Sequence, residues 1–228
     1  GSLVSTGRPT NISPITGLGG TGAIWVQDWE GNLTWNWTYS SNDFLLHHDI
    51  EVLPNGNIMA FAWVREDEAS LIAAGRDPAT IPEQNEIWTG RVMEIERTGA
   101  TTGSIVWQWE VGDHLVQDFD NTKANFGSVS DNPQLVNLNY YPNDPDWLHL
   151  NGISYNAEFD QIALSVHRFN EVWVSDHSTT TAEAATHTGG DSGKGGDLLY
   201  RWGNPEAYGR GTEADRQIKS QHDVQWIG

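Results

Sequence analysis

Residues 50–64 read IEVLPNGNIMAFAWV, which is two β-rich segments joined by a tight turn. The turn is Pro54-Asn55-Gly56-Asn57, and an Asn-Gly pair between apolar segments is a strong signal for a β-hairpin. The second segment, 58–64, is apolar almost throughout, which is typical of a buried strand. This stretch therefore predicts two paired strands.

Short β-rich segments of the same kind fill most of the chain. They are separated by Gly, Asn, Asp and Pro, and helical periodicity is hard to find between them. The predicted strands are 22–28, 33–39, 50–53, 58–64, 104–111, 161–166 and 171–176. One short helix is expected over 68–74. The sequence therefore predicts an all-β fold.

An aromatic pattern recurs three times along the chain. Each cycle begins with an apolar residue followed by tryptophan, at Ile24-Trp25, Ile87-Trp88 and Val172-Trp173. An aromatic-x-Trp segment follows, at Trp35-Asn36-Trp37, Trp107-Gln108-Trp109 and Tyr200-Arg201-Trp202. A histidine that opens a further strand ends each cycle, at His48, His149 and His222. Such repeats are typical of radially arranged sheets.

This repeat predicts a β-propeller over residues 22–228, with 1–21 as an N-terminal extension or edge segment. The length of each cycle allows about three to four blades, whereas propellers typically have about four to eight. We therefore expect a partial ring, completed by further residues or by other copies of the chain. Long inserts at 113–146 and 177–211 are expected to be functional loops. A self-contained β-sandwich with decorated loops is the alternative.

The charge of the chain limits its partners. The net charge is −19 with only 12 Lys and Arg, which argues against nucleic-acid binding because phosphate contacts need a basic face. An anionic substrate would need a locally positive pocket within this acidic protein. Cysteine is absent, which excludes disulfides and thiolate chemistry. No apolar run approaches the ~20 residues that span a membrane.

Eight short motifs follow one another in a defined order. They are HHDI at 47–50, LPNGN at 53–57, DH at 113–114, QDFD at 117–120, DWLHLN at 146–151, DHSTT at 176–180, YRWGNP at 200–205 and QHD at 221–223. Together they resemble the bacterial aryl-sulfate sulfotransferase family from about Gly22 onward. The resemblance implies a six-bladed propeller with its active site near the central channel, in a periplasmic or extracellular protein. It implies sulfuryl transfer from a phenolic sulfate ester to a phenol, with no nucleotide donor and no required cofactor.

The resemblance also implies roles for particular residues. The histidine that attacks sulfur falls on His222. The groups that hold the anion fall on His48, His149 and Asn151. An arginine is expected in a Ser-x-Arg setting, but the segment reads Ser165-Val166-His167-Arg168, with His167 in the expected slot. Neighbouring side chains of a strand point to opposite faces, so Arg168 replaces the missing group only where a bulge re-aims it.

The remaining histidines and the acidic insert give further candidates. His114 is a candidate lining residue of the pocket, and His177 is expected to cap a turn. His47 and His187 are expected to be exposed. The acidic insert offers oxygen ligands for Ca²⁺, with a solvated acidic loop as the alternative. The candidate calcium ligands are Asp118, Asp120, Asp144 and Asp146.

Three functions remain open from the sequence. The histidine set favours an enzyme, a nucleotide-independent aryl sulfotransferase that uses an aryl sulfate donor and a phenolic acceptor. The second hypothesis is a non-catalytic extracellular propeller that is used for binding or assembly and is stabilised by calcium. The acidic surface and the displaced arginine favour it. An incomplete ring exposes strand edges that invite pairing with another chain, so a homo-oligomer or a completing chain is a candidate partner. A hydrolase of sulfate esters is the third reading.

Overall fold

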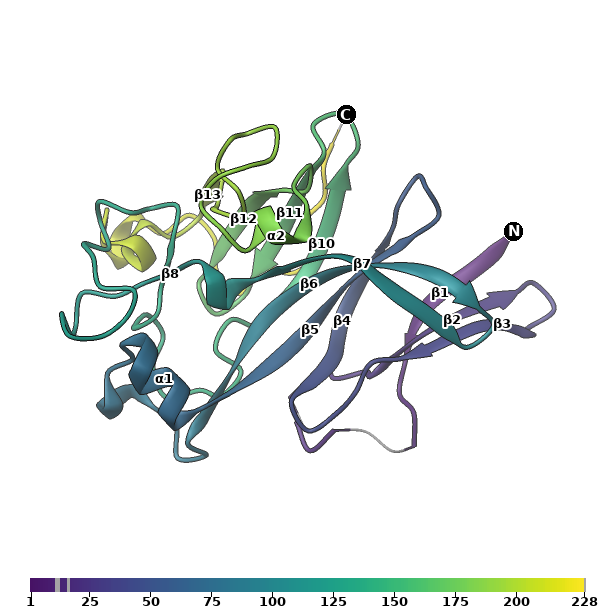
Figure 1. Ribbon diagram of the computed structural model, residues 1–228, viewed down its shortest axis with the longest axis horizontal. Coiled ribbons are helices and arrows are strands. Elements are labelled where there is room, and N and C mark those ends of the chain that lie inside the picture. The colour runs from purple at the N-terminus through teal and green to yellow at the C-terminus, as the bar shows by residue number, and fades with distance from the viewer. Residues whose placement is uncertain (11–12, 16, 228) are drawn as a thin grey trace.

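Three antiparallel sheets, each formed from strands that are consecutive in the chain, are the framework of the computed structural model, which describes residues 1–10, 13–15 and 17–227 (Figure 1). The first sheet holds β1 (Ser2–Gly7), β2 (Ala23–Asp28) and β3 (Leu33–Thr38). The second holds β4 (Phe44–Val52), β5 (Ile58–Asp67), β6 (Glu86–Gly99) and β7 (Thr102–Glu110). The third holds β10 (Leu150–Asn156), β11 (Gln161–Val166), β12 (Glu171–Asp176) and β13 (Tyr200–Trp202). The all-β prediction is confirmed.

Helices are short and lie outside the sheets. The predicted helix over 68–74 is confirmed as α1 (Glu68–Ala74), which begins where the Asp67 side chain accepts a hydrogen bond from the Ser70 amide. The second helix, α2 (Thr181–Ala184), begins with a capping box between Thr180 and Glu183. Single 3₁₀ turns cover Pro78–Thr80, Val111–Asp113, Pro205–Tyr208 and Glu213–Asp215. Among the described residues, no helix is long and apolar enough to cross a membrane.

The predicted hairpin at 50–64 forms between β4 and β5. Val52 pairs with Ile58, and the turn between them contains Gly56 in the left-handed region, with φ of 86°. The strand β4 begins earlier than predicted, because residues from Phe44 onward already pair with β5. A register shift between His47 and Ile50 interrupts this pairing, so the apolar alternation restarts there and hides the first half of the strand.

The sheets pack face to face around apolar side chains, with the second sheet between the other two (Figure 1). One core cluster joins the first sheet to the second through residues such as Trp35, Trp37 and Met93. A larger cluster joins the second sheet to the third and includes Trp109 and Trp173. The described residues form no closed ring of sheets.

The sequence repeat corresponds to paired outer strands. The apolar-Trp pairs lie in β2, β6 and β12, and the aromatic-x-Trp segments lie in β3, β7 and β13. In the first and third sheets the two motifs lie opposite each other, as in the Ile24–Trp37 and Val172–Trp202 pairs. In the second sheet β6 has 14 residues, so Trp109 pairs with Val92 further along the strand.

The segments outside the repeat contribute strands of their own. β1 pairs with β2, so the N-terminal segment supplies an edge strand. In the first insert, β8 (Leu115–Val116) pairs in parallel with β9 (Val136–Asn137). The strand β13 lies inside the range 177–211 that the sequence analysis assigns to the second insert, so the connection between strands ends at residue 199. Both connections lie close to the third sheet (Figure 1).

Candidate functional site

Four imidazoles from separate parts of the chain come together in one group, which we call the histidine cluster: His48, His149, His167 and His222. The ring centroids of His48 and His149 are 4.5 Å apart, and those of His149 and His167 are 4.9 Å apart. His222 lies 5.2 Å from His167 and 6.1 Å from His149, again between ring centroids. Three histidines that the repeat singles out, together with His167, thus face a common space.

Irregular backbone aims two of these rings. The pairing of β4 with β5 shifts register between His47 and Ile50, and the pairing of β10 with β11 shifts between Leu150 and Gly152. His48 and His149 have φ of 51° and 50°, a left-handed conformation that is uncommon for residues other than glycine. Bulges next to active sites commonly re-aim a side chain, and the two histidines occupy such positions in adjacent sheets.

Two glycines allow the segments of the site to pack closely. An added Cβ at Gly19, whose φ is 89°, would lie 2.3 Å from the His48 ring. An added Cβ at Gly152 would lie 2.7 Å from the backbone nitrogen of Asp223. Glycine is therefore required at 19 for the His48 ring, and at 152 for the C-terminal segment that carries His222.

A buried carboxylate holds the central ring. Asp146 is 6% exposed, accepts a hydrogen bond of 2.8 Å from Trp63 Nε1, and is hydrogen-bonded to His149 Nδ1. The carboxylate is an acceptor, so His149 donates from Nδ1 and its Nε2 remains for a ligand. Asp146 therefore fixes the orientation of His149, as carboxylates do for imidazoles in many active sites.

His47 is a buried residue that packs against the histidine cluster. The side chain of His47 was predicted to be exposed, and this prediction is wrong, because His47 is 1% exposed and stacks on Trp63 with ring centroids 4.2 Å apart. The bulge after His47 turns two consecutive histidines toward the interior, where strand alternation would separate them. The Nδ1 atoms of His47 and His48 are 2.9 Å apart, so one donates a hydrogen to the other.

The clustering of rings lowers their basicity. Burial lowers the pKa of His48 to about 4, and the neighbouring His149 adds to this effect. Burial, followed by the charges of His149 and His222, lowers the pKa of His167 to about 4 as well. Burial also lowers the pKa of His47 far below its usual value. Without a bound anion, these three rings are therefore neutral at neutral pH.

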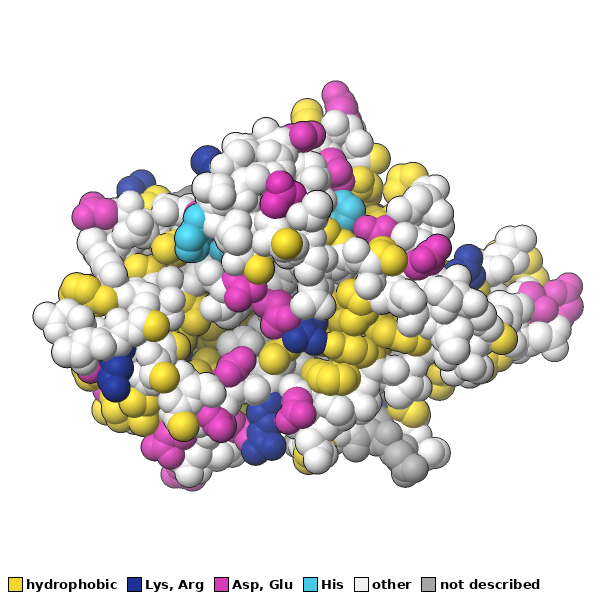
Figure 2. Space-filling view, in the orientation of Figure 1, with side chains coloured by type: hydrophobic (Ala, Val, Ile, Leu, Met, Phe, Trp, Pro, Cys, Tyr) yellow, Lys and Arg dark blue, Asp and Glu magenta, His cyan; other side chains and the backbone are white. Residues whose placement is uncertain are grey.

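A cavity of about 190 Å³ that is partly lined by basic side chains lies beside His167. Its lining includes Tyr141, His167, Arg168, Arg216, Lys219 and Ser220. Three of the 12 Lys and Arg residues of the chain thus gather here, although acidic side chains are more widespread than basic ones on the face seen in Figure 2. Arg168 is paired with Asp144 and Arg216 with Glu206, so carboxylates balance part of this positive charge and the basic groups that line the cavity are the candidates for holding an anion.

Arg168 reaches this cavity because the strand ends before it. β11 ends at Val166, so His167 and Arg168 lie in the following turn and the alternation of a strand does not apply to them. Both side chains line the same cavity. Arg168 Nη2 lies 2.6 Å from Asp144 Oδ2, and Nη1 donates to the Tyr141 hydroxyl over 3.0 Å. A bulge was expected to be necessary for Arg168 to point to the same side as His167, but the strand ends before both residues, so no bulge is needed.

Asn151 contacts the C-terminal segment. It is 6% exposed, and its Nδ2 donates a hydrogen bond of 3.1 Å to the backbone oxygen of Gln221. The Gln221 side chain donates to the Glu171 backbone oxygen over 2.7 Å. These bonds hold Gln221, the residue before His222, in place. The His222 side chain itself is exposed, and its Nδ1 lies 3.4 Å from the Ser220 backbone oxygen.

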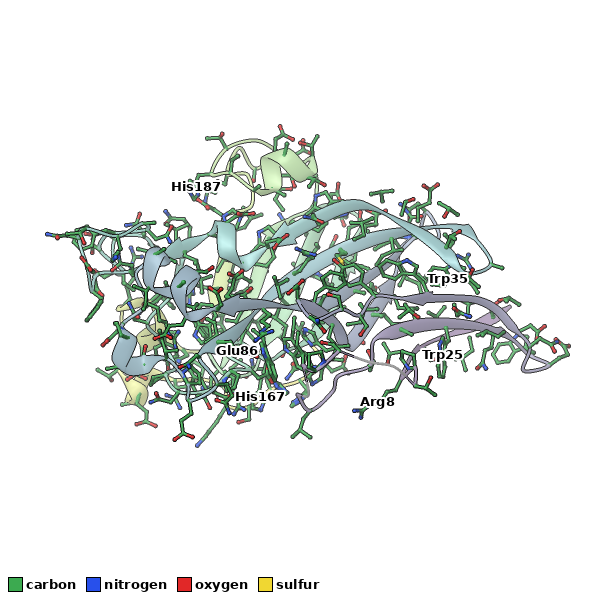
Figure 3. All side chains as sticks on the ribbon, turned by 60° about the horizontal axis from the view of Figure 1, so that its bottom comes forward. Arg8, Trp25, Trp35, Glu86, His167 and His187 are labelled. Carbon is green, nitrogen blue, oxygen red and sulfur yellow. The ribbon has the colours of Figure 1, made fainter. Side chains whose placement is uncertain are left out.

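The other candidate residues lie apart from the histidine cluster. His114 is completely buried and contacts Asp197 and the Ala184 backbone oxygen. His177 contacts Glu94 and Asp160 over 3.0 and 2.7 Å, bridging the second and third sheets. His187 is exposed, as predicted. Figure 3 shows His187 and His167 well separated on the molecule.

The candidate calcium ligands do not form one group. Asp118 is exposed, and Asp120 accepts hydrogen bonds from the amide and hydroxyl of Thr122. Asp144 pairs with Arg168, and Asp146 with His149. Within the described part of the chain, the His, Asp and Glu group close enough to hold a metal is a different one, formed by His114, His187 and Asp197. Calcium binding by the insert stays a prediction.

The chain is similar to a known protein family and to solved structures. The sequence model of the family described as arylsulfotransferase (ASST) matches residues 24–181, a range that includes His48, His149 and His167 and ends before His222. Hydrazine synthase of Kuenenia stuttgartiensis is similar to the chain with 12% identity and a TM-score of 0.39, over 88% of this chain and 46% of that chain. No curated protein matches the sequence.

Proposed function

Because the chain belongs to the arylsulfotransferase family, we propose that it transfers a sulfuryl group from a phenolic sulfate ester to a phenol acceptor through a histidine intermediate. The family supports aryl sulfotransferase activity as the general reaction class. The observation that carries the specific proposal is the convergence of His48, His149, His167 and His222 beside a cavity lined by basic side chains.

The proposed reaction has two steps. An imidazole nitrogen of His222 attacks sulfur, so that an N–S bond forms while the S–O bond to the aryl group breaks and the phenolate leaves. The oxygen of the acceptor phenol then attacks the same sulfur and gives its proton to the solvent, from which the released donor phenolate takes one up, and the imidazole leaves as the N–S bond breaks. Imidazole suits this role because it is nucleophilic when neutral and is also a good leaving group.

The position of His222 supports its assignment as nucleophile. Its ring is exposed, so a bulky aryl sulfate has access to it. Its Nδ1 faces the Ser220 backbone oxygen, an acceptor, which favours the tautomer with hydrogen on Nδ1 and a lone pair on Nε2. His149 and His167 flank this ring, where they can donate to the sulfuryl oxygens.

The remaining groups of the site would stabilise negative charge. Sulfuryl transfer resembles phosphoryl transfer, in which the protein mainly positions the group and stabilises charge spread over its oxygens. His167 Nδ1 is buried and has no hydrogen-bond partner among the described residues, so it is available to an anion. Binding an anion favours protonation of His48 and His167, because it opposes the causes that lower their pKa.

We further propose that the three sheets are consecutive blades of a six-bladed propeller. Each sheet is an antiparallel meander, and the first strands of the second and third sheets, β4 and β10, lie next to each other. His48 belongs to β4 and His149 immediately precedes β10, so both would line the central channel. A crystal structure with a bound aryl sulfate would test this arrangement, since the ligand should lie among the inner strands.

The reaction is tested with a chromogenic aryl sulfate and a phenol acceptor. We expect release of the donor phenol that requires the acceptor and is lost in His222→Ala. Stopping the reaction before the acceptor is added should leave one sulfuryl mass on the peptide that contains His222. The matched control is Gln225→Ala, which changes an exposed polar residue of the same segment.

The same assay separates the alternative functions. Phenol release that is equal with and without acceptor would identify a sulfate-ester hydrolase instead. No turnover, with aryl sulfate still bound and binding weakened in His167→Ala, would identify a binding module. A transfer activity that persists in His222→Ala would contradict the assignment of the nucleophile.

A further inference from the structure

A second group of potential ligands lies outside the histidine cluster and is built from His114, His187 and Asp197. Asp197 Oδ1 lies 3.0 Å from His114 Nδ1 and 2.7 Å from His187 Nδ1. One ligand atom of each residue lies within 4.8 Å of the other two. We propose that these three residues bind a divalent first-row transition metal ion, with zinc as the best match.

The hydrogen bonding of His114 supports a cation at this position. Its Nε2 lies 2.8 Å from the backbone oxygen of Ala184, which can only accept, so the hydrogen of the neutral ring belongs on Nε2. Nδ1 then directs a lone pair at a carboxylate oxygen. Two acceptors at 3.0 Å need either a proton or a cation between them, and a metal ion is a cation that fits both ligand types. Imidazoles that bind metals characteristically donate their other N–H to a backbone carbonyl or a carboxylate.

The ligand types and spacing suit zinc better than calcium. Two imidazole nitrogens and one carboxylate oxygen are a common zinc set, whereas calcium prefers about six to eight oxygens. A tetrahedral ion with bonds of about 2.0–2.1 Å keeps its ligand atoms about 3.4 Å apart. The observed separations of 3.0 and 2.7 Å require the side chains to move apart by less than about 1 Å. The exposed ring of His187 leaves the fourth position open to water.

The surrounding structure holds the two buried ligands in place. The Trp109 ring stacks on His114 with centroids 5.7 Å apart, and Trp109 Nε1 donates to the Gly196 backbone oxygen over 2.7 Å. An added Cβ at Gly196 would lie 2.4 Å from His114 Nε2, so glycine allows the segment carrying Asp197 to approach. His114 and Asp197 are 0% and 6% exposed, so the site is largely preformed.

A bound ion would link segments that are far apart in sequence. His114 follows β7, and Asp197 lies 83 residues later, in the connection between α2 and β13. Metal binding to the folded chain stabilises it, because the site does not exist in the unfolded chain. We therefore assign this site a structural role, in which the ion holds the α2–β13 connection next to the second sheet. The inference does not depend on the proposed sulfotransferase activity.

The test uses the whole chain, stripped with a chelator and titrated with ZnCl₂ by calorimetry, with metal content measured after gel filtration. We expect one zinc ion per chain and a higher Tm with zinc, but no such effect with CaCl₂. His187→Ala should weaken zinc binding by more than the roughly 10–100-fold that follows from loss of an outer partner. Because His187 is exposed, the metal-free variant should melt at the temperature of the metal-free wild type.

Two further variants keep the proposal falsifiable. His222→Ala changes another exposed histidine and should retain zinc, whereas Asp197→Asn should lose it. Absence of stoichiometric zinc in the wild type would overturn the proposal. Retention of zinc in both His187→Ala and Asp197→Asn would also overturn it. Loss of zinc in His222→Ala alone would locate the ion in the histidine cluster and would likewise overturn it.

Discussion

His48 and His149 belong to different sheets, yet their ring centroids lie 4.5 Å apart and both residues have φ close to +50°. His48 lies within the register shift of β4, and His149 immediately precedes β10, whose register shifts between Leu150 and Gly152. Left-handed backbone costs on the order of 1–3 kcal/mol outside glycine and tends to persist where function requires it. The matching strain at equivalent repeat positions indicates that the backbone of both strands serves to aim these two rings.

The contact between Gly19 and His48 gives the first prediction. Gly19→Ala should displace the His48 ring, because the added Cβ would lie 2.3 Å from it. A displacement of about 1 Å in a catalytic site can cost about 100-fold in rate, so we expect a loss of that order in kcat for sulfuryl transfer. Gly31→Ala is the matched control, since Gly31 also has positive φ but meets nothing within 4 Å. Both variants should lose about 1–3 kcal/mol of stability, and equal activities would refute the prediction.

The pKa values of the cluster predict a pH-dependent affinity for anions. The pKa of His48 and of His167 is lowered to about 4, so both rings are neutral near pH 7. An anion raises these pKa values, so its binding takes up protons and its affinity increases as the pH falls from about 6.5 toward 4. Calorimetry of sulfate binding in two buffers of different ionisation enthalpy measures the uptake directly. His167→Asn should reduce the uptake, and affinity that is independent of pH would contradict the prediction.

The same two histidines predict the acid stability of the unliganded protein. In the unfolded chain they titrate near 6.5, whereas in the folded chain burial, with neighbouring charges, lowers their pKa to about 4. Between these values the unfolded state binds more protons, so the free energy of unfolding decreases as the pH falls through this window. Urea unfolding of His48→Asn should show a flatter dependence than the wild type over this range. If the pH dependence of the free energy of unfolding is the same in His48→Asn and the wild type, His48 does not cause it.

Much of the architecture was predictable because its signals are local. Asn55-Gly56 marks the β4–β5 turn, and the repeated tryptophans mark paired strands, so the repeat also indicated His48, His149 and His222, although His48 lies within β4 and His222 lies in no strand of the described residues. The burial of His47 was not predictable, because the bulge after it breaks strand alternation without a sequence signal. His114 shows a second limit, since its partner Asp197 lies 83 residues away and no local pattern links the two.

Replacing Asp146 should reduce activity while every residue proposed to contact the substrate stays unchanged. Asp146→Asn leaves one acceptor oxygen for two donors, Trp63 Nε1 and His149 Nδ1, so the side chain no longer fixes both the imidazole ring and its tautomer. We expect kcat to fall by about 10–100-fold, as for loss of an orienting carboxylate beside an imidazole ligand. Asp118→Asn, a change at an exposed carboxylate, is the control. Rescue of kcat by Asp146→Glu, together with a changed pH profile in Asp146→Asn, would distinguish orientation from simple structural damage.

Glu94 predicts how the second and third sheets are held together. Its carboxylate accepts hydrogen bonds from the side chains of Asn55, Asn57 and His177. The bond to His177 is the main cause that lowers the pKa of Glu94 to about 2. Hydrogen bonds to a charged group contribute about 1.5–3 kcal/mol each, and Glu94→Gln should lower the free energy of unfolding at pH 7 by about this amount.

The pH dependence of this loss identifies its origin. Because the folded pKa of Glu94 is depressed, its contribution is complete above about pH 4.5 and is lost as the pH falls toward 2. The difference between wild type and Glu94→Gln in urea unfolding should therefore shrink on acidification. Glu96→Gln, at an exposed position of the same strand β6, should show no difference at either pH. A difference that stays constant down to pH 3 would mean that Glu94 acts through packing, because protonation of the carboxylate would then leave its contribution intact.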